Sequence, residues 1–280
     1  MSTTRRVATV TEPAPTASST PIVVAINAAR RCGETLELAT ALAASIGADL
    51  EVVFVEDAKL LQLADLPVTR EVDRISGTTR EMDSQRMLRT LRCEVLQLRR
   101  ELSRIGKTTT VRSTVRVVRG HYFSEALAAS ASVQVTFMYG ARSRLPGEHK
   151  PRTPATSGAA VGWAARKRPL WTLFDGSPAS ARALKVAIKL AYTLAGNLVV
   201  LVPGGRAEDV ENRKREAQAA ADRVDLQYLV VAENRFSQLG RVLAPGAGGL
   251  LVLARKSPDL ESSAALDYLE SLAVPVVLVA

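Results

Sequence analysis

The sequence predicts an α/β fold made of two tandem, doubly wound parallel-sheet domains, and three observations support this prediction. Residues 169–202 read as strand, turn, helix and strand, which is one unit of a parallel sheet. The same pattern occurs near the N-terminus, where an ungapped shift of 148 residues places Ile22 on Leu170. The chain is 47% hydrophobic but only 4% aromatic, which is typical of Ala-, Val- and Leu-rich helices packed on parallel strands.

The unit at residues 169–202 has clear boundaries. An apolar run at 170–174 stops at the turn sequence DGSP, residues 175–178. Apolar residues then recur at spacings of three and four, which predicts a helix that ends at Gly196. The short apolar run at 198–202 follows as a second buried strand.

The early copy of this unit shares identical residues with the later one, mostly on the core face of the helix and strand. The identical pairs are Leu36 and Leu184, Ala39 and Ala187, Leu42 and Leu190, Ala43 and Ala191, Leu50 and Leu198, and Val52 and Val200. An internal duplication explains this match. Convergent amphipathic patterning of two unrelated segments is the alternative.

This arrangement resembles the universal stress protein family. The resemblance is carried by residues 23–57 in the first half, and by LFDGSPASARALKVAIKLA (173–191) and VPVVLVA (274–280) in the second. It covers most of residues 21–140 and 169–280. It implies an adenine-nucleotide-alpha-hydrolase-like fold and a non-catalytic bacterial protein that acts in a stress response through partner binding.

The predicted organisation has four parts. Residues 1–20 form a tail rich in Thr, Ser, Pro and Ala, and residues 21–140 form the first domain. Residues 141–168 contain three prolines and many charges and form a basic linker, and residues 169–280 form the second domain. The first domain lacks a clear fifth strand, because the linker stands where that strand is expected.

In the first domain, a long helix at 81–105 carries an apolar stripe that is expected to face the sheet, although a coiled-coil pairing face is an alternative. The connection at 57–80 contains four leucines, at 60, 61, 63 and 66, that are expected to pack on the domain or on a partner. The other predicted elements are strands at 22–26, 50–55, 111–118 (an edge, because it carries charges) and 133–139, and helices at 34–46 and 121–129.

The second domain is more regular, and its last strand, 274–279, is apolar on both faces. We expect that strand at a sheet edge, where it would pair with the first domain or with a second chain as a dimer. A protein partner or self-association through the terminal strand is therefore predicted. The remaining elements are helices at 207–224, 236–243 and 262–272, and strands at 226–231 and 249–253.

Charge and composition narrow the function. The net charge is +9, and residues 80–119 hold eleven Lys and Arg against four Asp and Glu. This density suits either a polyanion or simply a solvated face, and nucleic acid is disfavoured because no aromatic residues interleave the charges. No apolar run reaches the length of a membrane span, and the two cysteines form no motif, so we expect a cytoplasmic protein without a membrane partner.

The resemblance also directs attention to the carboxyl ends of the strands. Nucleotide-binding relatives carry an Asp after strand one and a glycine loop after strand four, whose bare amides cradle phosphate. The second half keeps Asp175, followed by Gly176 and Ser177, but has Ala254 and Ser257 where glycines are expected. This is a degenerate nucleotide-binding motif. Asp175 is alternatively a turn residue, with Ser177 or Ser180 capping the helix.

The first half departs from the nucleotide-binding motif at other positions. It has Asn27 in place of the Asp and keeps only Gly140 of the glycine loop. The cofactor is therefore left open, and ATP is not favoured. His121 and His149, the only histidines, have no metal-ligand spacing, and no nucleophile motif is present, so an enzyme is not predicted. The alternatives are an ATP- or AMP-binding sensor of the same fold, and an enzyme of the wider nucleotide-binding α/β group.

Overall fold

The computed structural model describes residues 20–27, 33–66, 69–72, 77–131, 133–139, 168–221, 224–231, 243, 249–256, 260, 269, 272 and 274–280. Its elements are β1 (Ile22–Asn27), α1 (Gly33–Ile46), β2 (Leu50–Asp57), α2 (Ala58–Ala64), β3 (Arg70–Val72), β4 (Thr79–Glu81), α3 (Ser84–Gly106), β5 (Ser113–Gly120), α4 (Tyr122–Ser130), β6 (Val135–Tyr139), β7 (Leu170–Leu173), α6 (Pro178–Leu194), β8 (Leu198–Pro203), α7 (Ala207–Ala221), β9 (Leu226–Val231), β10 (Leu250–Ala254) and β11 (Pro275–Val279). The predicted tail, nearly all of the linker, and nearly all of the helices predicted at 236–243 and 262–272 lie outside the described residues.

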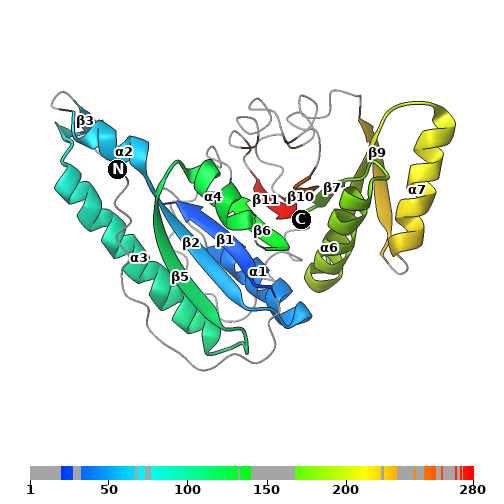
Figure 1. The fold of residues 1–280 in the computed structure, drawn as a ribbon, viewed down its shortest axis with the longest axis horizontal. Coiled ribbons are helices and arrows are strands. Elements are labelled where there is room, and N and C mark those ends of the chain that lie inside the picture. The colour runs from blue at the N-terminus through cyan, green and yellow to red at the C-terminus, as the bar shows by residue number, and fades with distance from the viewer. Residues whose placement is uncertain are drawn as a thin grey trace.

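The α/β fold is confirmed, but the expectation of two separate sheets is wrong. Nine strands form one continuous sheet in the order β5-β2-β1-β6-β11-β10-β7-β8-β9 (Figure 1). The strands of each half are parallel to one another, and the two halves meet where β6 pairs with β11 in antiparallel register. The sheet is continuous because an open strand edge from each half hydrogen-bonds to the other.

The strand registers of the two halves correspond. Ile22 stands opposite Leu50 in the first half, and Leu170 stands opposite Leu198 in the second. Numbered within each half, the second has the order 3-2-1-4-5 and the first has 3-2-1-4. The position beside β6, where a fifth strand of the first half would lie, is occupied by β11.

The terminal strand β11 is therefore interior, which corrects the expectation that it lies at a sheet edge. It pairs with β10 on one side and with β6 on the other, where Val277 stands opposite Phe137. Both of these side chains are fully buried. Pairing with the first half is the arrangement observed, and both backbone edges of β11 are used within this chain.

Helices cover both faces of the sheet, so the fold is doubly wound. One apolar cluster contains side chains from α1, α3, α6 and α7 together with one face of the strands. A second cluster contains α4 side chains and the opposite face of the strands. The edge strand β5 is charged as predicted, and Arg116 and Arg119 on it pair with Glu51 and Glu56 of β2 at 2.7 and 2.9 Å.

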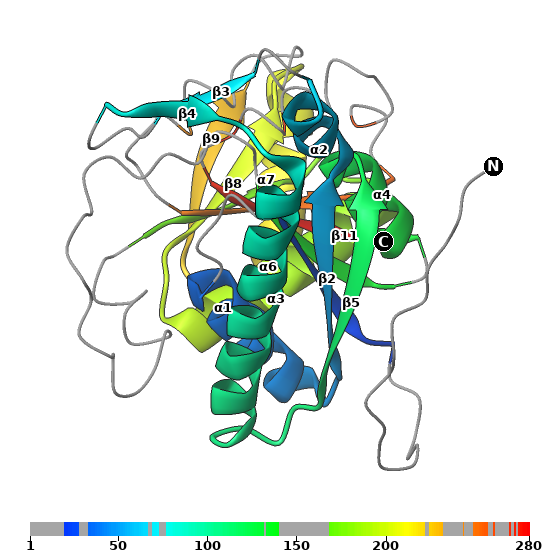
Figure 2. The ribbon, with the colours of Figure 1, turned by 90° about the vertical axis from the view of Figure 1, so that its left-hand side faces the viewer.

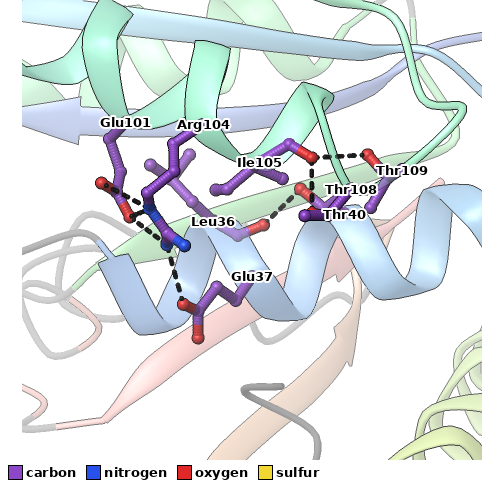
Figure 3. A network of polar contacts seen from close by, with 8 residues as sticks. All are labelled: Leu36, Glu37, Thr40, Glu101, Arg104, Ile105, Thr108 and Thr109. Carbon is purple, nitrogen blue, oxygen red and sulfur yellow. Dashed lines mark hydrogen bonds and ion pairs between the residues drawn. The ribbon is translucent and has the colours of Figure 1, made fainter. Parts of the chain in front are cut away.

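The long helix α3 lies as predicted, with its stripe on the core. The buried side chains recur every three or four residues: Leu91, Val95, Leu98, Leu102 and Ile105. The coiled-coil alternative is thereby excluded for this stripe. At its C-terminal end, Arg104 hydrogen-bonds Glu101 at 2.6 Å and reaches Glu37 of α1 at 3.4 Å (Figure 3). This contact ties the two neighbouring helices together.

The predicted connection at 57–80 contains structure of its own. It forms α2 and then a two-stranded antiparallel hairpin, β3 with β4. Leu61 packs against the core, whereas Leu63 and Leu66 are 46% and 50% exposed. Leu63 and Leu66 thus do not pack on the domain, because α2 is short and turns only one side toward it, and their packing on a partner stays a prediction.

The ends of α1 and α6 match each other closely. Gly47 has φ 67°, and Ala195, its counterpart in the repeat, has φ 47° and ψ 41°. The next residue closes each helix in the same way, with Ala48 N–H donating to Ala43 at 2.9 Å and Gly196 N–H donating to Ala191 at 3.0 Å. The left-handed residue that ends α6 is therefore Ala195, and not Gly196 as the sequence suggested.

We predict that Ala195→Gly stabilises the protein by about 1 kcal/mol, because glycine adopts left-handed backbone without the steric cost of a Cβ. The reciprocal change, Gly47→Ala, should destabilise it by a similar amount. A Cβ at Gly47 has nothing within 4 Å, so its cost is purely conformational. Urea unfolding of both variants measures these effects, and a stability loss in Ala195→Gly would contradict the prediction.

Candidate functional site

Asp175 lies two residues after β7, at the carboxyl end of a strand inside the sheet. Its side chain is half-buried, and the carboxylate accepts the backbone N–H of Ser177 at 2.9 Å. The backbone N–H of Asp175 donates to the Ser180 hydroxyl at 3.4 Å. The carboxylate therefore has a structural task, which is to shape the turn that leads into α6.

Ser177 is the N-cap of α6, and Ser180 supports it. The Ser177 hydroxyl accepts the backbone N–H of Ser180 at 3.1 Å, and the Ser180 hydroxyl donates to the carbonyl of Ser177 at 2.9 Å. Pro178 occupies the first turn as predicted, and Gly176 has φ 85°, a conformation that favours glycine. The sequence named both serines as alternative caps, and the structure uses both in one turn.

A small cavity lies beside this turn, with a volume of about 10 Å³. This is about the space that one water molecule needs. The sequence pointed to Asp175 and Ser177 but missed Leu253 and Leu260, whose only signal is their apolar character near the end of β10. The lining residues are Leu173, Asp175, Ser177, Ser180, Leu253, Ala254 and Leu260.

The sequence places the expected phosphate-binding glycine loop at the end of β10. In the structure, residues there are buried or hydrogen-bonded within the chain. Ala254 is buried, and the half-buried Arg255 donates its backbone N–H to Val279 at 2.7 Å. The Arg255 guanidinium donates to the carbonyl of Ser130, the last residue of α4 in the other half. The Arg255 guanidinium therefore places positive charge at the C-terminal end of a helix, where it is favourable.

The first-half counterpart is described only in part. Asn27 ends β1 and is half-buried, and its Oδ1 is buried without a hydrogen-bond partner among the described residues. Gly140 lies outside the described residues. The structure thus brings together Asp175, Gly176 and Ser177, and it does not bring Asn27 to them, because the two halves of the sheet run in opposite directions.

One ionisable group away from this site is strongly perturbed. Partial burial on α3 raises the pKa of Glu94 from 4.5 to about 7. Desolvation is the only cause, and Glu94 does not line the cavity, so the shift concerns stability rather than chemistry.

Within the described residues, no cluster of His, Cys, Asp and Glu could hold a metal ion. No described helix combines the length and apolarity needed to cross a membrane.

The first prediction from this site concerns the cap. Ser177→Ala should lower the free energy of unfolding by about 1 kcal/mol, because the N-terminal amide of α6 that it accepts loses its partner. Thr193→Ala serves as a control on the same helix, since that hydroxyl only donates to the Lys189 carbonyl one turn earlier. Equal stability losses in the two variants, measured by urea unfolding, would contradict the assigned cap.

The second prediction concerns Glu94. Because its pKa is higher in the folded state than in the unfolded chain, its contribution to stability is present at low pH and is lost as pH rises through about 7. Glu94→Gln should therefore stabilise the protein at pH 8 relative to the wild type, with a smaller gain at pH 5. Glu94→Asp keeps a titrating carboxyl and should retain the pH dependence. Thermal unfolding across this range tests both, and a gain that does not change with pH would refute the prediction.

The comparisons with known proteins concern the fold. No protein-family model matches the chain, and no curated protein matches it. A solved universal stress protein in complex with cAMP is 18% identical, covers 40% of this chain and 97% of its own, and has a TM-score of 0.32. One from Archaeoglobus fulgidus is 11% identical over 92% of this chain and 95% of its own, with a TM-score of 0.48. The cytoplasmic domain of a prokaryotic cation chloride cotransporter is also 11% identical, over 93% of this chain and 95% of its own, with a TM-score of 0.45. The solved structures to which the chain is similar include universal stress proteins and a transporter's cytoplasmic domain.

Proposed function

We propose that this chain is a non-catalytic, universal-stress-type protein that acts in the cytoplasm in a stress response by binding a partner protein. The resemblance of residues 23–57 and 173–191 to that family suggests the role. The strand order 3-2-1-4-5 of the second half supports it. The chain supplies its own antiparallel partner for β11, so the proposed partner binds elsewhere on the surface.

The observation that carries this proposal is that the groups around the Asp175 turn are already hydrogen-bonded within the chain. A nucleotide site here would need an Asp175 carboxylate that is open to the ligand, backbone amides after β10 that are open to phosphate, and room for both. The Asp175 carboxylate instead accepts the Ser177 N–H, the Arg255 N–H donates to Val279, and the adjoining cavity is about 10 Å³. These groups are already used within the chain, which supports a function other than nucleotide binding.

A second candidate function is an ATP- or AMP-binding sensor of the same fold. It is favoured by one observation, the position of Asp175 at the carboxyl end of β7 next to β10, where ligands bind in open α/β sheets. For this function the Asp175 carboxylate would have to leave the Ser177 amide and contact a ribose or a base. That exchange costs an internal hydrogen bond before any ligand is bound.

We predict weak binding of Mg-ATP, with a Kd of about 0.1 mM or higher, equivalent to about −5.5 kcal/mol or weaker. The physical reason is that the Asp175 carboxylate is held by the Ser177 amide, and that Ala254 and Ser257 stand where the resemblance expects the glycines whose bare amides bind phosphate. Isothermal titration calorimetry of the full chain with Mg-ATP and with AMP measures this directly.

The matched variants are Asp175→Ala and Asn27→Ala, which change the equivalent positions of the two halves. Under the partner-binding function neither variant alters the weak ATP affinity by more than about threefold. Submicromolar ATP binding that disappears in Asp175→Ala and persists in Asn27→Ala would instead establish the sensor function.

A further inference from the structure

The outer side of α3 is a long, strongly basic surface. Every charged side chain of α3 that is exposed is basic, while its two acidic residues, Glu94 and Glu101, lie partly buried on the flank. Figure 2 shows α3 in front of the sheet with no other labelled element covering its outer side. We define the basic face by its exposed cations at the helix and its C-cap: Arg86, Arg89, Arg92, Arg99, Arg100 and Lys107.

Within the part of the chain that the structure describes, most of these charges have no acidic partner. Arg89 is 3.9 Å from Asp83, and both side chains are more than half exposed, so this contact contributes little. Arg104, which is paired with Glu101 and Glu37, is not counted in the basic face. Among the described residues, no acidic side chain pairs with Arg86, Arg92, Arg99 or Arg100.

An apolar side chain stands in the middle of the basic face. Leu96 is 51% exposed. Arg92 precedes it by four residues and Arg100 follows it by four, so one guanidinium lies a turn above the leucine and one a turn below. From Arg89 to Lys107 the helix rises about 27 Å at 1.5 Å per residue. The surface is therefore a linear row of cations around one apolar contact.

The row of arginines and the exposed Leu96 together distinguish among the partners that could bind a cationic surface. A second copy of this chain would bring the same basic face and would be repelled. A nucleic acid backbone would match the arginines, but it offers no apolar group to Leu96, and no aromatic side chain on α3 is available to stack on a base. An acidic amphipathic helix offers both carboxylates and an apolar side chain along a straight line of this length.

We propose that the basic face of α3 is a docking surface for an acidic amphipathic helix of a partner protein, with Leu96 as its apolar centre. This inference rests on the partner-binding function proposed above and names the surface and the chemistry of the partner. The carboxylates of the docked helix form charge-assisted hydrogen bonds with the arginines, and its apolar side chain covers Leu96.

The experiment uses the full chain and a synthetic helical peptide of about 18 residues, which matches the length of the surface. The peptide carries glutamates along one side around a central leucine, and a control peptide has glutamine in place of each glutamate. Fluorescence anisotropy at about 50 mM salt should show binding of the acidic peptide only. Raising the salt to about 500 mM should weaken it about tenfold or more, because the charges are exposed.

Two charge-matched double variants locate the surface. Arg92→Glu with Arg100→Glu should weaken peptide binding about tenfold or more. Lys185→Glu with Lys189→Glu makes the same charge change on exposed positions of α6 and should leave binding nearly unchanged. Leu96→Ser should weaken peptide binding about threefold while leaving the charges in place. Circular dichroism melting of each variant verifies that the fold is retained.

Each outcome decides the proposal. Absence of binding by the acidic peptide, or equal losses in the α3 and α6 variants, overturns it. Tighter, α3-dependent binding of poly(dT), or of vesicles of phosphatidylcholine with phosphatidylglycerol, also overturns it and assigns the surface to a phosphate polyanion. The ATP titration is a separate readout: tight ATP binding removes the proposed function, whereas failure of the peptide alone removes only this surface.

Discussion

The antiparallel pairing of β6 with β11 is the constraint on which the rest of this structure depends. A parallel sheet that ends in an uncovered apolar strand exposes unpaired backbone groups, and such an edge associates with whatever strand is available. Here each half of the chain supplies the missing neighbour of the other. Val277 and Phe137 face each other across this junction and are fully buried, so the contact is part of the core.

This junction also fixes where the carboxyl ends of the strands lie. Because β6 and β11 are antiparallel, the strands of the first half point opposite to those of the second. Asn27 at the end of β1 and Asp175 after β7 are equivalent positions in the alignment of the two halves. They therefore lie at the two opposite ends of the strands, although both strands are inside the sheet. The two positions that the sequence singled out therefore do not lie together in one site.

The end of β10 also takes part in the join between the two halves. Arg255 follows β10 at a position where a glycine loop would leave backbone amides open, and its side chain instead reaches Ser130 at the end of α4. The Ala280 N–H also donates to Gln134 of the first half, at 2.9 Å. Residues that follow β10 thus help to hold the two halves together, whereas the helix α3 lies away from the junction and carries exposed charges.

The sequence by itself determined the local elements and the cap of α6. The apolar periodicities depend on neighbours within a few residues, so α3, its buried stripe from Leu91 to Ile105 and the strand β9 were predictable. Ser177 and Pro178 likewise act on amides of their own turn. Only the tertiary structure decided that β11 is interior, that the sheet is single and that Arg255 binds Ser130. Each of these depends on a partner more than a hundred residues away, and an apolar strand pattern specifies burial without specifying which strand lies beside it.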